Sequence, residues 1–388
     1  MGNERNYNPD YKKGKTKVDF HMHSLGSFDG VHTIDFLVHR AKENNVEYLA
    51  VTDHNYISYL AQYLVKKGMK LGQAVYDIDG VKLVPGVEVT CRLKDVRNYK
   101  GNPCKMHLLV LAPDLSPNSP FVRLMDIKHK NDVVVDYGLL LGIFNVKGVE
   151  LSEAKVRKYI DEKRIFDPGF STMDRDDTYE FIMQEYPDMF KSKREFTEVY
   201  MMLPRATRIN MDVEDVIKVA GYAGGITSVA HPSSSFTHRT NYERDVYPSL
   251  IRKGIDGFEI GCNGINDRTL TLIKDAIKTT RSRNPILFTA GSDFHSYGKG
   301  QEIGELRDGT ELSRSDYGPL IKAIEDRQKI IMGDKTIQCR VRPQLNLQDV
   351  NDIVDKYARL AERDNVIPFD YTLFNTPYPD KEFIEKQQ

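Results

Sequence analysis

Long apolar runs are absent from this chain of 388 residues, and none approaches the ~20 residues that a membrane-spanning helix needs. An excess of charge is absent too, because 55 lysines and arginines are matched by 56 aspartates and glutamates. A net charge of −1 gives no overall positive field that would attract nucleic acid, although a local basic patch could still do so. With 40% apolar and 29% charged residues, the composition predicts a globular protein that forms a hydrophobic core and does not enter a membrane.

Cysteine is scarce, and no Cys-x-x-Cys pair occurs. The four cysteines are Cys91, Cys104, Cys262 and Cys339. Such wide separation argues against a disulfide framework and against a structural zinc knot. The first 16 residues are polar and rich in lysine, without the apolar segment of a signal peptide. We therefore expect a cytoplasmic protein.

Strand-like and helix-like segments alternate along most of the sequence. The runs with strand character are 16–20, 47–52, 82–89, 106–111, 226–230, 257–260 and 286–290. Helical periodicity fits the segments 33–44, 59–67, 213–220, 245–253 and 267–279. Most of the strand runs end at or contain a polar residue of a catalytic type. The alternation predicts an α/β fold, and the nearly continuous apolar strands predict a sheet covered on both faces.

The alternation stops between about 113 and 211, where charged, helix-prone sequence predicts a helical insertion. We expect a polar N-terminal extension at 1–15 and an α/β domain at 16–338 that contains this insertion. Residues 339–388 are expected to form a C-terminal helix followed by a tail rich in aromatic residues and proline. Such a tail suits packing along a surface or a partner chain, so a homo-oligomer formed through it is possible.

Histidine gives the strongest signal for chemistry. Six of the ten histidines lie in or just after strand runs, namely His21, His23, His54, His107, His231 and His295. The His21-x-His23 spacing places two imidazoles on one side of an extended segment, where both can bind one ion. An isolated pair of this kind also has ordinary structural explanations.

Carboxylates near the other strand runs strengthen the prediction of a metal site. Asp293 and His295 repeat the same spacing after a separate strand, while Asp53 and His54 follow a third strand, and Glu88 lies in PGVEVT. Imidazole and carboxylate together suit zinc, manganese or iron.

A hairpin between the runs around Glu88 and His107 would bring those two side chains together. If its loop is centred between Arg97 and Asn98, Glu88 lies directly opposite His107. One carboxylate could then bridge two ions while His107 binds one of them. A parallel arrangement of the two runs would remove this contact.

Seven motifs together resemble a known family. They are HMHSLGSFDG, AVTDHN, PGVEVT, MHLLVLA, VAHPS, GFEIG and TAGSDFHS, and they span about residues 17–296. In this order they are similar to the polymerase and histidinol phosphatase (PHP) family of metal-dependent phosphoesterases. The branch that includes nucleoside 3′,5′-bisphosphate phosphatases and 5′-3′ exonucleases is the most similar. The resemblance implies a distorted (β/α)7 barrel with a helical insertion after the MHLLVLA strand.

The resemblance also implies a cluster of two or three divalent metal ions, either manganese, zinc or iron. The first ion would be held by His21, His23, Glu88 and Asp293. Glu88 would bridge to a second ion held by His107 and His231. A third ion would be held by Asp29, His54 and His295. Many relatives have histidine at the position of Asp29, and the SFDG form fits the nucleotide-acting branch better.

Such a cluster implies hydrolysis of a phosphate ester by a hydroxide that the ions share. Glu88, His231, Asp293 and His295 are the residues expected to carry this catalysis. His231 or His295 could instead donate a proton to the leaving group, although a metal-bound imidazole is poorly suited to that role.

Three residues are candidates for binding the substrate. Arg205 ends the insertion, and His238 and Arg239 follow the AHP motif; a guanidinium suits a phosphate, as does that of nearby Arg208. A solvated surface role is also open for each of them. Glu259 could line the site, but the resemblance does not make it a ligand.

The leading prediction is a phosphoesterase acting on a phosphorylated small molecule or a nucleotide, with no membrane partner. A 5′-3′ exonuclease acting on the end of a short nucleic acid is one alternative. An amidohydrolase-type metalloenzyme is another, although it would usually place a bridging lysine where Glu88 stands. The third is a non-catalytic metal-binding module that docks onto a partner.

Overall fold

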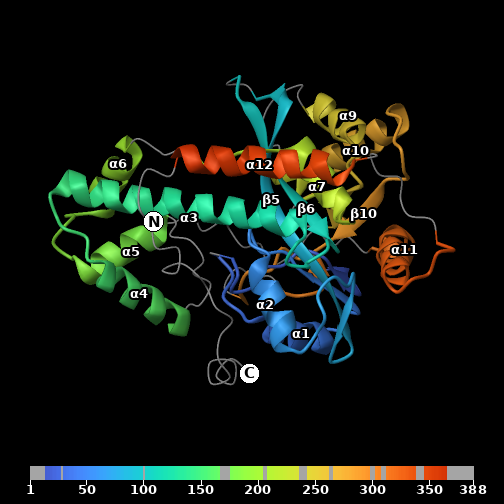
Figure 1. Ribbon diagram of the computed structural model, residues 1–388, viewed down its shortest axis with the longest axis horizontal. Helices are drawn as coiled ribbons and strands as arrows, with labels where there is room; N and C mark the ends of the chain where they lie inside the picture. Colours follow the sequence, from blue (N-terminus) through green and yellow to red (C-terminus); the bar gives the residue numbers. More distant parts are fainter. Residues whose placement is uncertain are drawn as a thin grey trace.

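The computed structural model describes residues 14–27, 29–98, 101–166, 175–203, 208–235, 243–261, 265–297, 302–306, 312–337 and 345–364 (Figure 1). Its central sheet has the strand order β10 (Leu287–Ala290), β9 (Gly257–Gly261), β8 (Ile226–Val229), β6 (Pro103–Leu111), β5 (Val81–Arg97), β3 (Tyr48–Val51) and β2 (Val18–Asp19). Strands β4 (Tyr76–Ile78) and β7 (Met211–Asp212) pair with β5 outside this order. Every strand run predicted from the sequence is present in this sheet.

The two ends of the sheet meet and close a barrel. A parallel bridge joins Met22, just after β2, to Phe294, just after β10. Beside it, the N–H of Phe20 donates to the carbonyl of Ala290 at 2.8 Å, and the N–H of Asp293 donates to the carbonyl of His21 at 2.8 Å. Because β6 is antiparallel to both β5 and β8, the barrel is distorted. The fold is therefore the distorted (β/α)7 barrel that the resemblance implied.

Helices cover the outside of the barrel. They are α1 (Ile34–Glu43), α2 (Ser58–Lys66), α7 (Val213–Tyr222), α8 (Pro232–Ser235), α9 (Glu243–Lys253), α10 (Asp267–Thr279) and α11 (Arg314–Ile331). Helix α1 shows how the sequence sets a boundary, because the N–H of Phe36 donates to Thr33 Oγ1 at 3.1 Å. Its buried face, including Leu37 and Ala41, packs into the main core. The short strands β1 (Gly14–Lys15) and β11 (Glu305–Leu306) pair separately.

Four helices lie between β6 and β7: α3 (Pro120–Lys147), α4 (Glu153–Phe166), α5 (Arg175–Glu185) and α6 (Lys193–Met202). Leu124 and Met125, near the start of α3, belong to the barrel's core. The far half of α3 extends away from the barrel, and α4, α5 and α6 gather there around a separate apolar cluster that includes Phe144, Phe181 and Phe196 (Figure 1). One helix thus joins the two hydrophobic cores.

Helix α12 (Leu347–Asp364) lies along α3, as Figure 1 shows. An ion pair of 3.6 Å between Arg123 Nη2 and Asp355 Oδ1 joins the two helices. The aromatic tail, through which an oligomer was considered, lies outside the described residues. Among the helices in the described ranges, none has the length and apolar character needed to cross a bilayer.

The β5–β6 hairpin is antiparallel as predicted, but the predicted register is wrong. Glu88 pairs with Leu109, and His107 pairs with Thr90. A register shift between Leu93 and Arg97 moves the centre of the hairpin away from the predicted position. The difference on the strand is two residues, so Glu88 and His107 still project from the same face of the sheet.

Candidate metal centre

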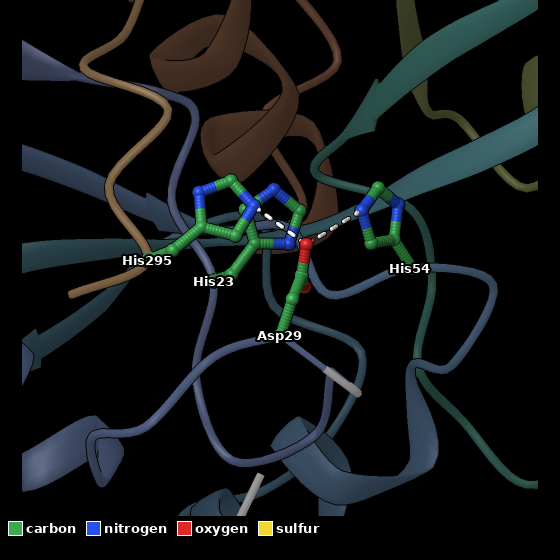
Figure 2. A group of neighbouring side chains, drawn as sticks. All are labelled: His23, Asp29, His54 and His295. Carbon is green, nitrogen blue, oxygen red and sulfur yellow. Dashed lines mark ion pairs between the residues drawn. The ribbon is translucent and has the colours of Figure 1, made fainter. Parts of the chain in front are cut away.

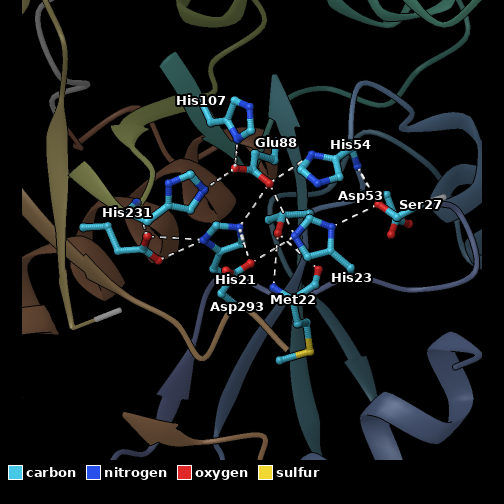
Figure 3. Close-up of polar contacts among 12 residues, drawn as sticks. His21, Met22, His23, Ser27, Asp53, His54, Glu88, His107, His231 and Asp293 are labelled. Carbon is cyan, nitrogen blue, oxygen red and sulfur yellow. Dashed lines mark hydrogen bonds and ion pairs between the residues drawn. The ribbon is translucent and has the colours of Figure 1, made fainter. Parts of the chain in front are cut away.

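The strand ends bring the predicted ligands together at one rim of the barrel. His21 and His23 follow β2, His54 follows β3, His231 follows β8, and Asp293 and His295 follow β10. Carboxyl ends of parallel barrel strands share one rim, which explains their convergence. Glu88 and His107 enter from within the long β5–β6 hairpin (Figure 3).

Glu88 is fully buried at the centre of this group. Its Oε1 lies 2.8 Å from His107 Nδ1 and 2.8 Å from His231 Nε2. Its Oε2 lies 3.1 Å from His54 Nδ1, 3.3 Å from His21 Nε2 and 3.3 Å from His23 Nε2. One carboxylate therefore faces imidazoles contributed by several separate strands, which is the arrangement expected of a bridging ligand (Figure 3).

The two aspartates complete the group. Asp293 Oδ1 lies 3.4 Å from His21 Nε2 and 3.4 Å from His23 Nε2. Asp29 Oδ2 lies 2.9 Å from His295 Nε2 and 3.6 Å from His54 Nε2 (Figure 2). The carboxylates thus stand between imidazoles at both ends of the site.

Among the residues that the structure describes, three sets of donor atoms, each within 4.8 Å of one another, could hold an ion. They are His23, Asp29, His54 and His295; His21, His23 and Glu88; and His54, Glu88 and His107. These sets overlap more than the expected subsites do. His23, expected at the first ion only, also lies near Asp29, and His54, expected at the third ion only, also lies near Glu88. His231 reaches the group through its contact with Glu88.

Several donor atoms are buried without a hydrogen bond. They are His21 Nε2, His23 Nε2, Glu88 Oε2 and Asp29 Oδ1. A buried polar atom left without a partner costs about 1–3 kcal/mol, so such a cluster within one site needs an explanation. These are the lone-pair atoms that a divalent cation uses, and the imidazole–carboxylate set suits zinc, manganese or iron. The residues present therefore fit the metal ions that the resemblance implies.

Charges in the site compensate one another. Burial opposes the charged form of Glu88, yet the imidazoles of His54, His107 and His21 hold the pKa of Glu88 well below its usual range. Burial also opposes a charge on His23, but the carboxylates of Asp293 and Glu88 outweigh it and raise the pKa of His23 to about 10. The carboxylates thus make the site strongly attractive to positive charge.

Two further residues support the candidate ligands. Glu259, on β9, contacts His21 Nδ1 at 3.1 Å and accepts the N–H of His231 at 2.6 Å. Ser27 contacts His23 Nδ1 at 3.0 Å and accepts the N–H of His54 at 2.8 Å. The sequence marked Glu259 only as a possible lining residue and did not indicate Ser27. A metal-bound imidazole usually needs a hydrogen-bond partner on its second ring nitrogen, and this need was the one signal that such supporting residues exist.

Cations lie beside His107. On the same face of the hairpin, the pair Thr90–His107 is followed by the pair Arg92–Lys105. Lys105 is in electrostatic contact with Arg208 and with Lys128 of α3. The hairpin alone makes Arg92 and Lys105 neighbours, whereas Arg208 and Lys128 reach Lys105 from other parts of the chain.

A hydrogen-bonded network anchors α3 next to the site. Asn55, adjacent to His54, donates to Asp132 Oδ2 on α3 at 3.2 Å and accepts the N–H of Thr90 at 2.8 Å. Arg208 pairs with Asp132 and with Asp136. The other predicted substrate residues, Arg205, His238 and Arg239, lie outside the described residues.

Comparison with known proteins agrees with this geometry. The family model of the PHP domain matches residues 19–199, which include His21, His23, Glu88 and His107. The match covers 181 of the 388 residues, so this part of the chain is similar to the PHP domain. A search of curated proteins finds no match.

Among solved structures, one with a TM-score above 0.5 has the same fold at low sequence identity, and two others are less similar. An amidohydrolase from Chromobacterium violaceum, with bound sulfate and no metal, is 19% identical and has a TM-score of 0.52, covering 80% of this chain and 97% of that one. A protein provisionally assigned as a metal-dependent phosphoesterase from Bifidobacterium adolescentis is 18% identical, with a TM-score of 0.49 and coverage of 80% and 96%. The lesion-specific endonuclease EndoQ of Pyrococcus furiosus is 16% identical, with a TM-score of 0.35 and coverage of 73% and 49%.

Proposed function

We propose that this protein is a metal-dependent phosphoesterase that hydrolyses a phosphate ester of a small molecule or a nucleotide. The observation that carries the proposal is the buried Glu88 carboxylate, which imidazoles of five histidines surround. Three donor atoms of this group, His21 Nε2, His23 Nε2 and Glu88 Oε2, are buried without hydrogen bonds. The PHP domain supports the same class of metal-dependent hydrolase.

Each predicted ligand has a defined task in this proposal. His21, His23, Glu88 and Asp293 would hold a first ion, and Glu88, His107 and His231 would hold a second. Asp29, His54 and His295 would hold a third. When bound, such ions lower the pKa of coordinated water and neutralise phosphate oxygens and the leaving alkoxide. The chain itself fixes the donors in place and excludes bulk water from Glu88, His21 and His23, which are fully buried.

The charges around the site favour an anionic substrate. Arg92, Lys105 and Arg208 lie on the side of His107 that faces α3. Guanidinium and ammonium groups bind phosphate oxygens with charge-assisted hydrogen bonds. Arg205, His238 and Arg239 remain proposed substrate residues. This surrounding charge supports phosphoester hydrolysis over an amidohydrolase reaction, and a carboxylate, Glu88, occupies the bridging position where that rival class would usually place a lysine.

Metal analysis combined with a phosphatase assay tests the proposal. Purified protein is expected to contain manganese, zinc or iron and to release phosphate from p-nitrophenyl phosphate with added manganese. A screen of nucleoside monophosphates, bisphosphates and 5′-phosphorylated oligomers then separates a phosphatase from an exonuclease. His21→Ala and Asp293→Ala should each reduce kcat/KM at least a thousandfold.

His39→Ala is the matched control, because His39 is exposed on α1 and should leave the rate unchanged. Folded protein that binds metal but hydrolyses no phosphate ester would contradict the proposal. Hydrolysis of amides in place of phosphate esters would favour the amidohydrolase alternative. If the unmodified protein shows no turnover and the variants lose binding to a partner, the result would favour the docking module.

A further inference from the structure

We propose that Glu259 and Ser27 are positioning residues that couple the metal subsites in pairs. Glu259 connects the first subsite to the second, and Ser27 connects the first to the third. Neither residue is among the ligands that the resemblance implies. The inference rests on the proposed metal-dependent function. It adds that two residues that are not ligands connect the separate subsites.

The contact between Glu259 and His21 fixes which ring nitrogen can bind an ion. Both side chains are fully buried, and Glu259 Oε1 lies 3.1 Å from His21 Nδ1. A carboxylate only accepts hydrogen bonds, so the hydrogen of the neutral imidazole resides on Nδ1. The lone pair on Nε2 is then directed at Glu88 and Asp293, whose nearest oxygens lie at 3.3 and 3.4 Å.

The second contact of Glu259 acts on a ligand from a different strand. Its Oε2 accepts the backbone N–H of His231 at 2.6 Å. His231 has a φ of +28°, a conformation that residues with a side chain rarely adopt. The hydrogen bond stabilises this backbone, which aims His231 Nε2 at Glu88 Oε1, 2.8 Å away. One carboxylate therefore orients a ligand of the first subsite and a ligand of the second.

Ser27 repeats this arrangement on the other side of the site. Its fully buried hydroxyl lies 3.0 Å from His23 Nδ1 and accepts the backbone N–H of His54 at 2.8 Å (Figure 3). His23 belongs to the first subsite, and His54 belongs to the third. Each imidazole of the His-x-His pair thus shares its supporting residue with a ligand of a different ion.

The two supports predict different patterns of metal loss, which share the first subsite. Without Glu259, His21 loses its fixed tautomer and His231 loses its backbone support, while Asp29, His54 and His295 keep their contacts. Without Ser27, His23 and His54 are affected, while His107 and His231 keep theirs. Loss of such a supporting partner typically weakens metal binding 10- to 100-fold.

The experiment compares Glu259→Gln, Ser27→Ala and the unmodified protein. Each is stripped with a chelator and titrated with zinc in a metal-buffered solution, and bound zinc is counted by mass spectrometry. Anomalous diffraction from zinc-loaded crystals identifies which subsites are filled. Glu259→Gln should weaken the first two subsites at least tenfold and leave the third filled, whereas Ser27→Ala should weaken the first and third.

Asp256→Asn is the matched control for Glu259→Gln. Asp256 is a buried acid just before β9, and its Oδ2 accepts the N–H and the hydroxyl of Thr227, each at 3.0 Å. Asp256→Asn therefore removes a similar charge and weakens similar hydrogen bonds, but those hydrogen bonds do not reach a candidate ligand. Circular dichroism checks that each variant is folded.

The outcomes separate this inference from the proposed function. Equal zinc loss in Glu259→Gln and Asp256→Asn, uniform weakening of all subsites, or unchanged binding in both test variants would overturn the coupling. An unmodified protein that binds zinc but hydrolyses no phosphate ester would contradict the phosphoesterase while leaving the coupling testable. An unmodified protein that binds no zinc, manganese or iron would overturn both.

Discussion

Glu88 is the residue on which the proposed site depends most. Its two oxygens contact imidazoles that follow or lie in different strands. The same residue lies at a point where β5 bridges to His54. Its identity therefore matters both for binding cations and for the packing of the barrel rim.

Glu88→Gln should retain the shape of this side chain but lose its charge and its capacity to bridge. We expect bound metal to fall by at least one ion per chain and kcat/KM to fall at least a thousandfold, because two ions lose a shared ligand. Metal analysis and phosphatase kinetics measure these effects. Glu43→Gln, an exposed change on α1, should alter neither. Full metal content in Glu88→Gln would contradict a bridging role.

Gly291 shows how closely the backbone packs beneath the site. A Cβ placed on Gly291 would lie 2.3 Å from the Cβ of His21 and 2.6 Å from its backbone N. Gly291→Ala should therefore displace His21 and destabilise the protein by about 2 kcal/mol, as overpacking does. Thermal denaturation measures the loss.

Gly318→Ala is the control for that change. Gly318 lies in α11, and a Cβ there meets no atom within 4 Å. Alanine loses less backbone entropy than glycine, but Pro319 follows and crowds a Cβ on the preceding helical residue, so the substitution should change stability little. A Gly291→Ala protein as stable as the unmodified one would show that the rim tolerates movement of His21.

Among the elements, helix α3 carries the insertion and packs against the barrel. His129 on α3 is buried and stacks on Tyr56, with ring centroids 4.0 Å apart. Burial lowers the pKa of His129 from 6.5 to about 4; Lys128 and Lys130 act in the same direction, and Asp132 opposes them. A neutral, buried histidine thus joins the helix to the loop that carries His54.

This histidine should make the protein less stable in acid. Between pH 6.5 and pH 4 the unfolded chain binds a proton at His129 that the folded chain does not, so the free energy of unfolding falls as the pH falls. The loss from this group approaches about 3 kcal/mol at pH 4. Urea denaturation of the unmodified protein and His129→Phe at several pH values should show a smaller loss in the variant. Parallel curves for the two proteins would contradict this role of His129.

The elements also show where sequence patterns succeed and where they fail. Helix α1 lies within the predicted helical segment 33–44, because periodicity and the N-cap at Thr33 are local features. The hairpin register was wrong by two residues, because a register shift near Leu93 depends on how the two strands twist together. Helix α3 was expected only as part of a charged helical region. The sequence did not indicate that its charged residues Lys128 and Asp132 would be buried, because they can be buried only by pairing with each other.

For the molecule as a whole, removing the ions should lower stability. The site buries several carboxylates and imidazoles whose lone pairs a cation would satisfy. A ligand present at a hundred times its Kd stabilises the folded state by about 2.7 kcal/mol, which corresponds to roughly 5 °C in Tm. Chelation with EDTA should lower Tm by about this amount, and added manganese should restore it.

The double variant Asp29→Asn/His295→Gln gives the control for chelation. Because it removes two candidate ligands of the third subsite, EDTA should lower its Tm by less than in the unmodified protein. Differential scanning fluorimetry measures each shift. An equal response to EDTA in both proteins would indicate that the third subsite binds no stabilising ion.

The candidate site could be predicted from the sequence as far as local spacing extends. The two-residue spacing of His21 and His23, and of Asp293 and His295, places donors on one side of a strand end whatever the rest of the fold does. The support that Glu259 gives to His21 could not be predicted, because 238 positions separate the two residues.

By itself, the sequence determined the type of the main barrel strands and helices, the strand ends that carry imidazoles and carboxylates, and the class of metal that such donors suit. These properties follow from alternation along a strand, helix caps and donor chemistry, which act over a few residues. Only the tertiary structure decided the closure of β2 against β10, the grouping of the donors around Glu88 and the pairing of ligands through Glu259 and Ser27. These features depend on the closing of a twisted sheet, and contacts between distant residues form only when the whole barrel packs.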